Sequence, residues 1–125
     1  TPETPMPRYV DGFVLLVPAK KLAAYKKLAA AASKVWLEHG ALQYVETEGD
    51  DLTPGFGLPF TKLTKAKKGE TVVFSWIMYK SRAHRDRVNA KVMKDKRLAA
   101  MCDPKNMPFD MKRMSCGGFK TMVDV

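Results

Sequence analysis

Residues 79–88, YKSRAHRDRV, place three arginines and a histidine directly behind a segment that is typical of a strand. Ser81 offers an N-cap oxygen for a helix that begins here. The free N–H groups of a helix N-terminus, together with Arg82 and Arg85, are able to bind a carboxylate or a phosphate. His84 would then donate or accept a proton beside the bound anion. This segment is therefore a candidate anion-binding and proton-transfer site.

The same histidine has a simpler structural interpretation. Counted from Ser81, His84 lies one helical turn before Val88 and shares the side of the helix that should face the sheet. A single histidine in such a place is more often half-buried and hydrogen-bonded than functional. The neighbouring arginines would then be solvated. Both interpretations stay open from sequence alone.

Asp11 is the second candidate, because it interrupts an apolar segment and shares a face with Tyr9 and Phe13. A carboxylate in that position needs a charged partner or a shifted pKa. Arg113, near the start of the last predicted strand, is one available partner. The alternative is that Asp11 acts as a general base.

Other residues carry weaker signals. Trp36 and Trp76 are candidate walls of a ligand pocket, although large aromatic side chains are most simply core residues. His39 lies at the predicted end of a helix, where an imidazolium satisfies free carbonyl groups. Glu46 and Glu48 share one face of a predicted strand, which is more often a solvent-exposed face than a proton-sharing pair.

The chain has no glycine-rich phosphate motif, nucleophile elbow, HExxH helix or zinc-type cysteine spacing. Its two cysteines, Cys102 and Cys116, are unpaired in sequence, and Cys116 is expected to be a buried, inert thiol. The two glycines that follow Cys116 indicate a bulge or a close backbone approach. We expect no metal and no cofactor. Haem is disfavoured because neither of the two histidines lies in a haem-attachment motif.

The elements that position these residues follow from hydrophobic periodicity. Apolar and aromatic residues predict strands over 8–17, 41–48, 70–80 and 112–124. Three-and-four spacing and a capping serine predict helices over 20–39, 81–94 and 96–101. Residues 49–69 are predicted to be a long irregular loop. The order β-α-β-β-α-β predicts an α+β, ferredoxin-like fold with an antiparallel sheet.

Both faces of the predicted sheet are apolar. In the third strand one face carries Val73, Ser75, Ile77 and Tyr79, and the other carries Val72, Phe74, Trp76 and Met78. Two helices cover only one face, and the bare face would be a large apolar patch on a monomer. We therefore expect a homodimer in which two sheets pack face to face as a dimeric α/β barrel.

The formal net charge of +9 is compatible with nucleic-acid binding. The basic residues are scattered, however, and the sheet has no RNA-recognition signature, so only weak and non-specific binding is expected. The sequence has no membrane-spanning segment and no secretory signal, and its few cysteines favour the cytoplasm. Residues 1–7 are expected to be disordered or expression-derived, with Met6 as a natural start, and residues 8–125 to form one domain.

Four sequence segments resemble the YbaA-like family of uncharacterised bacterial proteins: RYVDGFVLLVP, VWLEHGALQYVETEGDD, GETVVFSWIMYKSRAHRDRVNAKVM and DPKNMPFDMKRM with GGF after it. The resemblance runs from about residue 8 to residue 124 and implies the dimeric α/β-barrel superfamily. It implies no established reaction. Met111, Ser115 and Cys116 depart from the family pattern, so a pocket near the last strand is expected to differ in shape from those of the relatives.

Together these features predict a homodimeric small-molecule-binding barrel whose pocket lies between sheet and helices. A cofactor-independent enzyme acting on an anionic or carbonyl compound is one form that it can take, and whether it is an enzyme stays open. Asp11 or His84 would move a proton, and Arg82 or Arg85 would hold an anion. The alternative is a basic nucleic-acid-binding module.

Overall fold

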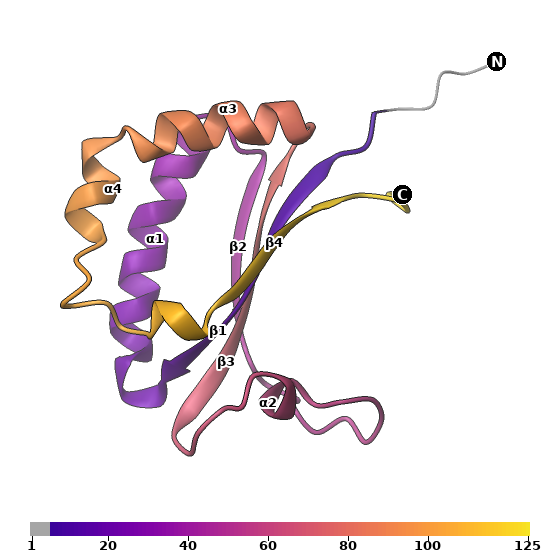
Figure 1. The fold of residues 1–125 in the computed structure, drawn as a ribbon, viewed down its shortest axis with the longest axis vertical. Helices are drawn as coiled ribbons and strands as arrows, with labels where there is room; N and C mark the ends of the chain where they lie inside the picture. Colours follow the sequence, from indigo (N-terminus) through magenta and orange to yellow (C-terminus); the bar gives the residue numbers. More distant parts are fainter. Residues whose placement is uncertain (1–5) are drawn as a thin grey trace.

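A four-stranded antiparallel sheet organises the chain in the computed structural model, which describes residues 6–125 (Figure 1). The strands are β1 (Tyr9–Pro18), β2 (Gln43–Glu48), β3 (Glu70–Tyr79) and β4 (Ser115–Lys120). Their order across the sheet is β2-β3-β1-β4, with every neighbouring pair antiparallel. The predicted α+β class and antiparallel sheet are confirmed.

Helices cover one face of this sheet (Figure 1). They are α1 (Leu22–Glu38), α3 (Arg82–Met93) and α4 (Lys96–Met101). Short 3-10 turns, η1 (Ala19–Lys21) and η2 (Met111–Arg113), precede α1 and β4. The single-turn helix α2 (Phe60–Leu63) lies on the opposite side of the sheet, within the loop that was predicted to be irregular. In the described residues, no helix is long and apolar enough to cross a bilayer.

The largest error in the predicted elements concerns the last strand. Residues 112–124 were predicted to be extended, but β4 covers only Ser115–Lys120. Asp110 caps the preceding 3-10 turn by accepting a hydrogen bond from the N–H of Lys112, at 3.0 Å. Because this turn occupies Met111–Arg113, the strand begins at Ser115 and not at residue 112. Residues 1–5 belong to the segment predicted to be disordered or expression-derived, and they lie outside the described residues.

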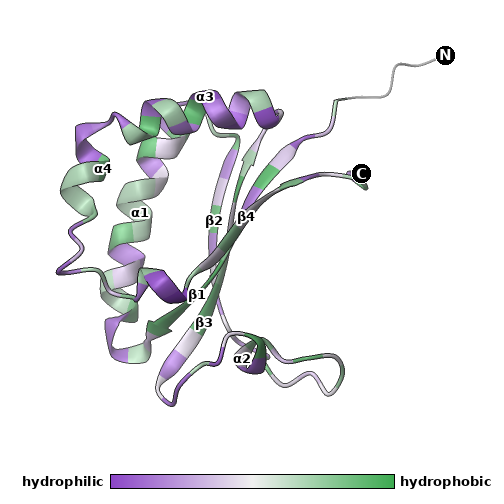
Figure 2. Ribbon diagram, viewed as in Figure 1, coloured by the Kyte–Doolittle hydropathy of each residue, from purple (hydrophilic) through white to green (hydrophobic). Residues whose placement is uncertain are grey.

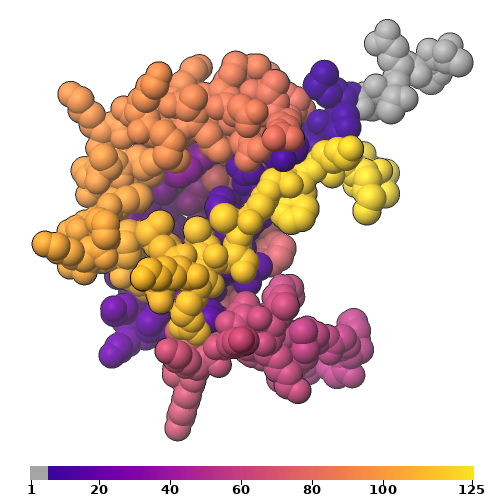
Figure 3. Space-filling model, in the orientation of Figure 1, coloured from indigo at the N-terminus to yellow at the C-terminus, as the bar shows by residue number. Residues whose placement is uncertain are grey.

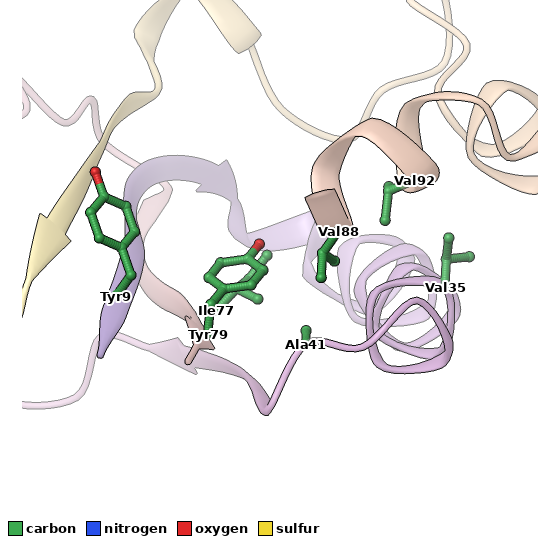
Figure 4. Close-up of a cluster of buried hydrophobic side chains, with 7 residues drawn as sticks. All are labelled: Tyr9, Val35, Ala41, Ile77, Tyr79, Val88 and Val92. Carbon is green, nitrogen blue, oxygen red and sulfur yellow. The ribbon is translucent and has the colours of Figure 1, made fainter. Parts of the chain in front are cut away.

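The core lies between the sheet and its helices in two clusters. The first gathers side chains from β1, β3, α1, α3 and the connection between α1 and β2, as Figure 4 shows: Tyr9, Val35, Ala41, Ile77, Tyr79, Val88 and Val92. The second lies toward the other end of the strands: Leu15, Val17, Tyr25, Ala29 and Val73. Between them, one row of side chains across the sheet holds Phe13, Ser75 and Glu46. Polar groups therefore interrupt the core where the two clusters meet.

The opposite face of the sheet is apolar but only partly covered. Phe60 of α2 contacts Phe74 edge to face, with 6.1 Å between the ring centroids, so α2 covers the end nearest the start of β3. Leu16 and Val72 at that end are buried. Phe74 is still 44% exposed beside α2, and Phe119, farther along the face, is 63% exposed. Figure 2 shows hydrophobic residues along much of β1 and β3.

Candidate functional site

A cavity of about 630 Å³ lies between the helix-bearing face of the sheet and the helices. Strands β1, β2 and β3 form its floor, and α1, α3, α4 and the segment leading into β4 form its walls. Figure 3 shows a hollow between α3 and this C-terminal segment. The lining is mostly apolar with a few polar groups, which is typical of small-molecule sites.

One polar end of the cavity is built around Asp11, whose residue exposure is only 7%. Arg85 of α3 donates from Nη1 to Asp11 Oδ1 at 2.9 Å. The guanidinium carbon of Arg85 also lies 4.8 Å from the centroid of the Tyr9 ring, within the range of a cation–π interaction. The predicted partner of Asp11 was wrong. Arg113 instead forms a two-pronged bond with Glu70, at 2.6 and 3.0 Å.

The register of α3 explains this pairing. Ser81 caps the helix by accepting a hydrogen bond from the N–H of His84 at 3.1 Å, as predicted. Residues spaced by four then share one side of the helix, which directs Arg85 and Asn89 toward β1. Asn89 donates to Asp11 Oδ2 at 3.5 Å. The first turn of α3 and the first strand are thus linked by a polar network inside the core.

Asn89 extends the network toward the aromatic side of the cavity. Its Oδ1 accepts hydrogen bonds from the indole N–H of Trp36 and the hydroxyl of Tyr79, each at 3.2 Å. Burial and the nearby Asp11 raise the pKa of Tyr79, so this hydroxyl stays neutral and donates. Asp11, Asn89 and Trp36 are therefore held in fixed relative positions.

Burial raises the pKa of the Asp11 carboxyl above its ordinary value. The charge of Arg85 and the hydrogen bond from Asn89 act in the opposite direction but do not outweigh burial. Arg85 bonds a second carboxylate as well, because Asp86 Oδ1 accepts a hydrogen bond from Arg85 Nε at 2.9 Å. A carboxyl group in this state is suited to exchange a proton with a bound molecule.

The second polar end of the cavity is Glu46 of β2, which the sequence assigned to a solvent-exposed face. Tyr25 of α1 donates to its Oε1 at 2.6 Å, and Tyr44 donates to its Oε2 at 2.9 Å. Burial and the adjacent carboxylate raise the pKa of both phenols, so they remain protonated donors. The sequence shows that Tyr44 shares the strand face of Glu46 and that Tyr25 lies on the apolar stripe of its helix, but it does not show that the three side chains meet.

The predicted wall residues divide between the two faces of the sheet. Trp36 lines the cavity and lies 6.0 Å from Tyr44, measured between ring centroids. Trp76 borders the cavity, but strand alternation places its indole on the opposite face. There its Nε1 donates to Gln43 at 3.1 Å. Trp36 is a wall of the site, whereas the Trp76 side chain is not.

The anion-binding group predicted at the start of α3 is not assembled. Arg82 is exposed, and neither Arg82 nor His84 lines the cavity. His84 Nδ1 accepts a hydrogen bond from the N–H of Lys80 at 2.9 Å, so the imidazole completes the helix cap. Burial, assisted by nearby cations, lowers its pKa. Of the three predicted residues, only Arg85 reaches the cavity.

The side chain of His39 also makes a structural contact. Its Nε2 lies 2.8 Å from Asp95 Oδ2, where Asp95 caps α4, so the end of α1 is tied to the start of α4. Within residues 6–125, no group of three His, Cys, Asp or Glu side chains gathers as a possible metal site.

The prediction that Cys116 is buried was wrong, because both cysteines are exposed and border the cavity. They belong to what we call the sulfur-rich wall: Met93, Met101, Cys102, Met107, Met111, Met114 and Cys116. The predicted close approach after Cys116 is confirmed. A Cβ atom on Gly118 would lie 2.3 Å from the Tyr9 hydroxyl oxygen, so any larger residue there would require the Tyr9 side chain to move.

Residues 8–111 match the family described as "Protein of unknown function (DUF1428)". The chain belongs to this family. It is 45% identical over 117 residues to "Uncharacterized protein YbaA" of Escherichia coli strain K12, and equally to that of Escherichia coli O157:H7 and of Shigella flexneri. The match covers 94% of this chain and 98% of each relative. The predicted family is confirmed, and the matched range, residues 8–111, contains the positions of both Asp11 and Glu46.

Among solved structures, the chain is similar to the crystal structures of AtUAH in complex with glyoxylate and with (S)-hydroxyglycine. The identity is 20% and the TM-score is 0.31 in both cases. The similarity covers 76% of this chain but only 23% of the AtUAH chain. A similarity this weak gives no information about the function of this protein.

Proposed function

We propose that the protein binds a small, largely apolar organic molecule between its sheet and helices, and that Asp11 exchanges a proton with a carbonyl compound bound there. The observation that carries this proposal is the Asp11 carboxyl itself. It is buried, its pKa is raised, and Arg85 and Asn89 hold it at the edge of an apolar cavity. Buried carboxyl groups with perturbed pKa values are typical of proton-transfer sites.

A carbonyl compound without a negative charge fits this cavity better than an anion. Arg85 is the cation among the lining residues, and Asp11 and Asp86 already accept its hydrogen bonds. Glu46 adds a second carboxylate to the lining. A ligand carboxylate would meet two like charges in a site of low polarity, which disfavours its binding.

The reaction class supported by this arrangement is proton transfer next to a carbonyl group. Ionised Asp11 would accept a proton from the carbon beside the carbonyl, leaving the electron pair of the C–H bond in an enolate. A guanidinium carries five N–H groups, and those of Arg85 that do not bond Asp11 or Asp86 would donate to the enolate oxygen. Return of the proton to carbon completes the cycle without any cofactor.

Exchange of hydrogen for deuterium tests this proposal directly. Small aryl ketones are incubated with the protein in D₂O, and loss of the proton signal beside the carbonyl is followed by NMR. We expect exchange above the buffer rate with the wild type and none above it with Asp11→Asn. Thermal shifts measured with the same ketones and with matched carboxylic acids report binding. If no ketone stabilises the wild type, or if Asp11→Asn exchanges as fast, the proposal is wrong.

We also propose that two copies associate through the uncovered face of the sheet. The exposed rings of Phe74 and Phe119 support this assembly, since α2 covers only one end of the face. A second copy presents the same apolar face, so the pair is self-complementary. The family resemblance implies the same dimeric barrel.

A further inference from the structure

The carboxylate of Glu46 lines the cavity without a cationic partner. Among residues 6–125, no Lys, Arg or His nitrogen lies within 4.0 Å of it. Its neighbour on the same strand face, Glu48, differs in this respect, because Lys26 lies 3.2 Å away. The phenols of Tyr25 and Tyr44 each donate one hydrogen bond to Glu46. A carboxylate has about four acceptor positions, so two of them remain for a ligand.

The two tyrosines that bond this carboxylate each pack against a further aromatic ring. Tyr44 lies beside Trp36 at 6.0 Å between centroids, and Tyr25 meets Phe109 edge to face at 5.7 Å. All four rings line the cavity. The faces of aromatic rings attract cations, and this attraction is stronger where water is excluded. This end of the cavity therefore combines one carboxylate with four aromatic side chains.

We infer that the Glu46 end of the cavity binds the ammonium group of an organic amine. An ammonium group donates hydrogen bonds to the free acceptor positions of Glu46 and contacts the ring faces around it. This inference rests on the proposed function, because it takes the cavity to be the ligand site. It adds the chemical class of the ligand: an amine that also carries a carbonyl group.

The sheet register separates the two polar ends of the cavity. Asp11 and Tyr44 both pair with Ile77, so they lie two strand spacings apart in one row. Glu46 lies two residues farther along β2. With about 4.8 Å between strands and about 3.4 Å per residue, the backbones of Asp11 and Glu46 are roughly 12 Å apart. The ligand therefore carries its ammonium group and its carbonyl group on opposite sides of an apolar body.

A purely structural function of Glu46 is the alternative, since its bond to Tyr25 ties α1 to β2. The substitution Glu46→Gln separates the two functions. It keeps an oxygen that accepts a phenol hydrogen bond and removes the negative charge. Glu48→Gln is the matched control, because it makes the same chemical change on the same strand face outside the cavity.

The experiment compares two probes of similar shape, the 2-phenylethylammonium ion and 2-phenylethanol, by isothermal titration calorimetry at pH 7. We expect the ammonium probe to bind wild type and Glu48→Gln at least about tenfold more tightly than the alcohol. With Glu46→Gln this preference should disappear, while the alcohol still binds. Nuclear Overhauser contacts should place the probe's CH₂ beside the nitrogen against the ring of Tyr44.

The other possible outcomes refute either the ammonium subsite or the ligand cavity. Equal affinities of the two probes for wild type, or an ammonium preference that survives in Glu46→Gln, would refute the ammonium subsite alone. If Glu46→Gln does not fold, the wild-type preference and the contacts to Tyr44 decide the question. Absence of binding by either probe would refute the proposed ligand cavity together with the subsite.

Discussion

Arg85 donates a 2.9 Å hydrogen bond to Asp11, which lies 74 positions earlier in the chain. The contact joins the first turn of α3 to the first strand and crosses the edge of the cavity. It therefore both stabilises the fold and positions the one buried carboxylate of the site.

Arg85→Met should destabilise the protein, because it leaves Asp11 buried without its charged partner. We expect a loss of about 1–3 kcal/mol in the free energy of unfolding, measured with urea. The matched control is Arg82→Met, on the same helix but exposed, which should change stability by less than about 0.5 kcal/mol. Equal effects of the two substitutions would contradict a stabilising contact between Arg85 and Asp11.

The raised pKa of Asp11 predicts a pH dependence of stability. The folded protein holds the Asp11 proton at pH values where the unfolded chain, with a pKa near 3.8, has lost it. The stability from this group is complete below pH 3.8 and is lost as the pH rises through the folded-state pKa. The wild type should therefore lose stability relative to Asp11→Asn as the pH rises from 3 to 7. Parallel curves for the two proteins would show that burial does not raise this pKa.

Gly118→Ala should disturb the Tyr9 side of the site, since the new Cβ would lie 2.3 Å from the Tyr9 hydroxyl oxygen. We expect a loss of about 1–3 kcal/mol and a displaced Tyr9 ring. Gly117→Ala is the control, because a Cβ there meets Phe119 only at an ordinary 3.7 Å. Thermal unfolding of both variants measures the difference. Similar melting temperatures would mean that Tyr9 moves aside without cost.

Phe74→Glu should convert the proposed dimer into a monomer, because it places a charge on the uncovered apolar face. Analytical ultracentrifugation at micromolar concentration should give twice the chain mass for wild type and the chain mass for the variant. Leu37→Glu, on the outer side of α1, should leave the dimer intact. A wild type that sediments as a folded monomer would refute the assembly.

Binding to nucleic acid should be weak, and its affinity should fall steeply as the salt concentration rises. The charge of +9 predicts a dissociation constant near ~10⁻⁴–10⁻⁶ M for short DNA or RNA at physiological salt, without sequence preference. Fluorescence polarisation at two salt concentrations measures it. Tight, sequence-selective binding that persists at the higher salt would favour a nucleic-acid-binding function over the cavity.

Local signals in the sequence were sufficient for the four strands and the three longer helices, but not for the single-turn helix α2 or the 3-10 turns. Strand alternation, helical spacing and the Ser81 cap predicted the order of the elements, and the structure confirms it. The start of β4 was wrong because Asp110 caps a 3-10 turn that no hydrophobic period reveals. Short polar turns depend on single hydrogen bonds, which are weak signals beside a run of apolar residues.

The candidate site was only partly predictable. Asp11 was found because a carboxylate within an apolar strand stands out, but its partner depends on where α3 crosses β1. Because of that crossing, Asp11 pairs with Arg85, and Arg113 pairs with Glu70. Glu46 was missed for a related reason. A half-apolar strand does not reveal that a tyrosine from a distant helix will reach its carboxylate.

The cavity has two parts that can change independently, the strands that carry its polar groups and the sulfur-rich wall. Asp11 and Glu46 project from strands whose positions are fixed by neighbouring backbone hydrogen bonds. Most of the wall comes from residues 93–114, outside the sheet, and methionine side chains repack readily around ligands of different shape. Under the proposed function, substitutions in that segment should alter the preference for one ligand over another while Asp11 and Glu46 keep their positions. Within the family, divergence of ligand choice should concentrate there, and the polar ends of the cavity should be inherited unchanged.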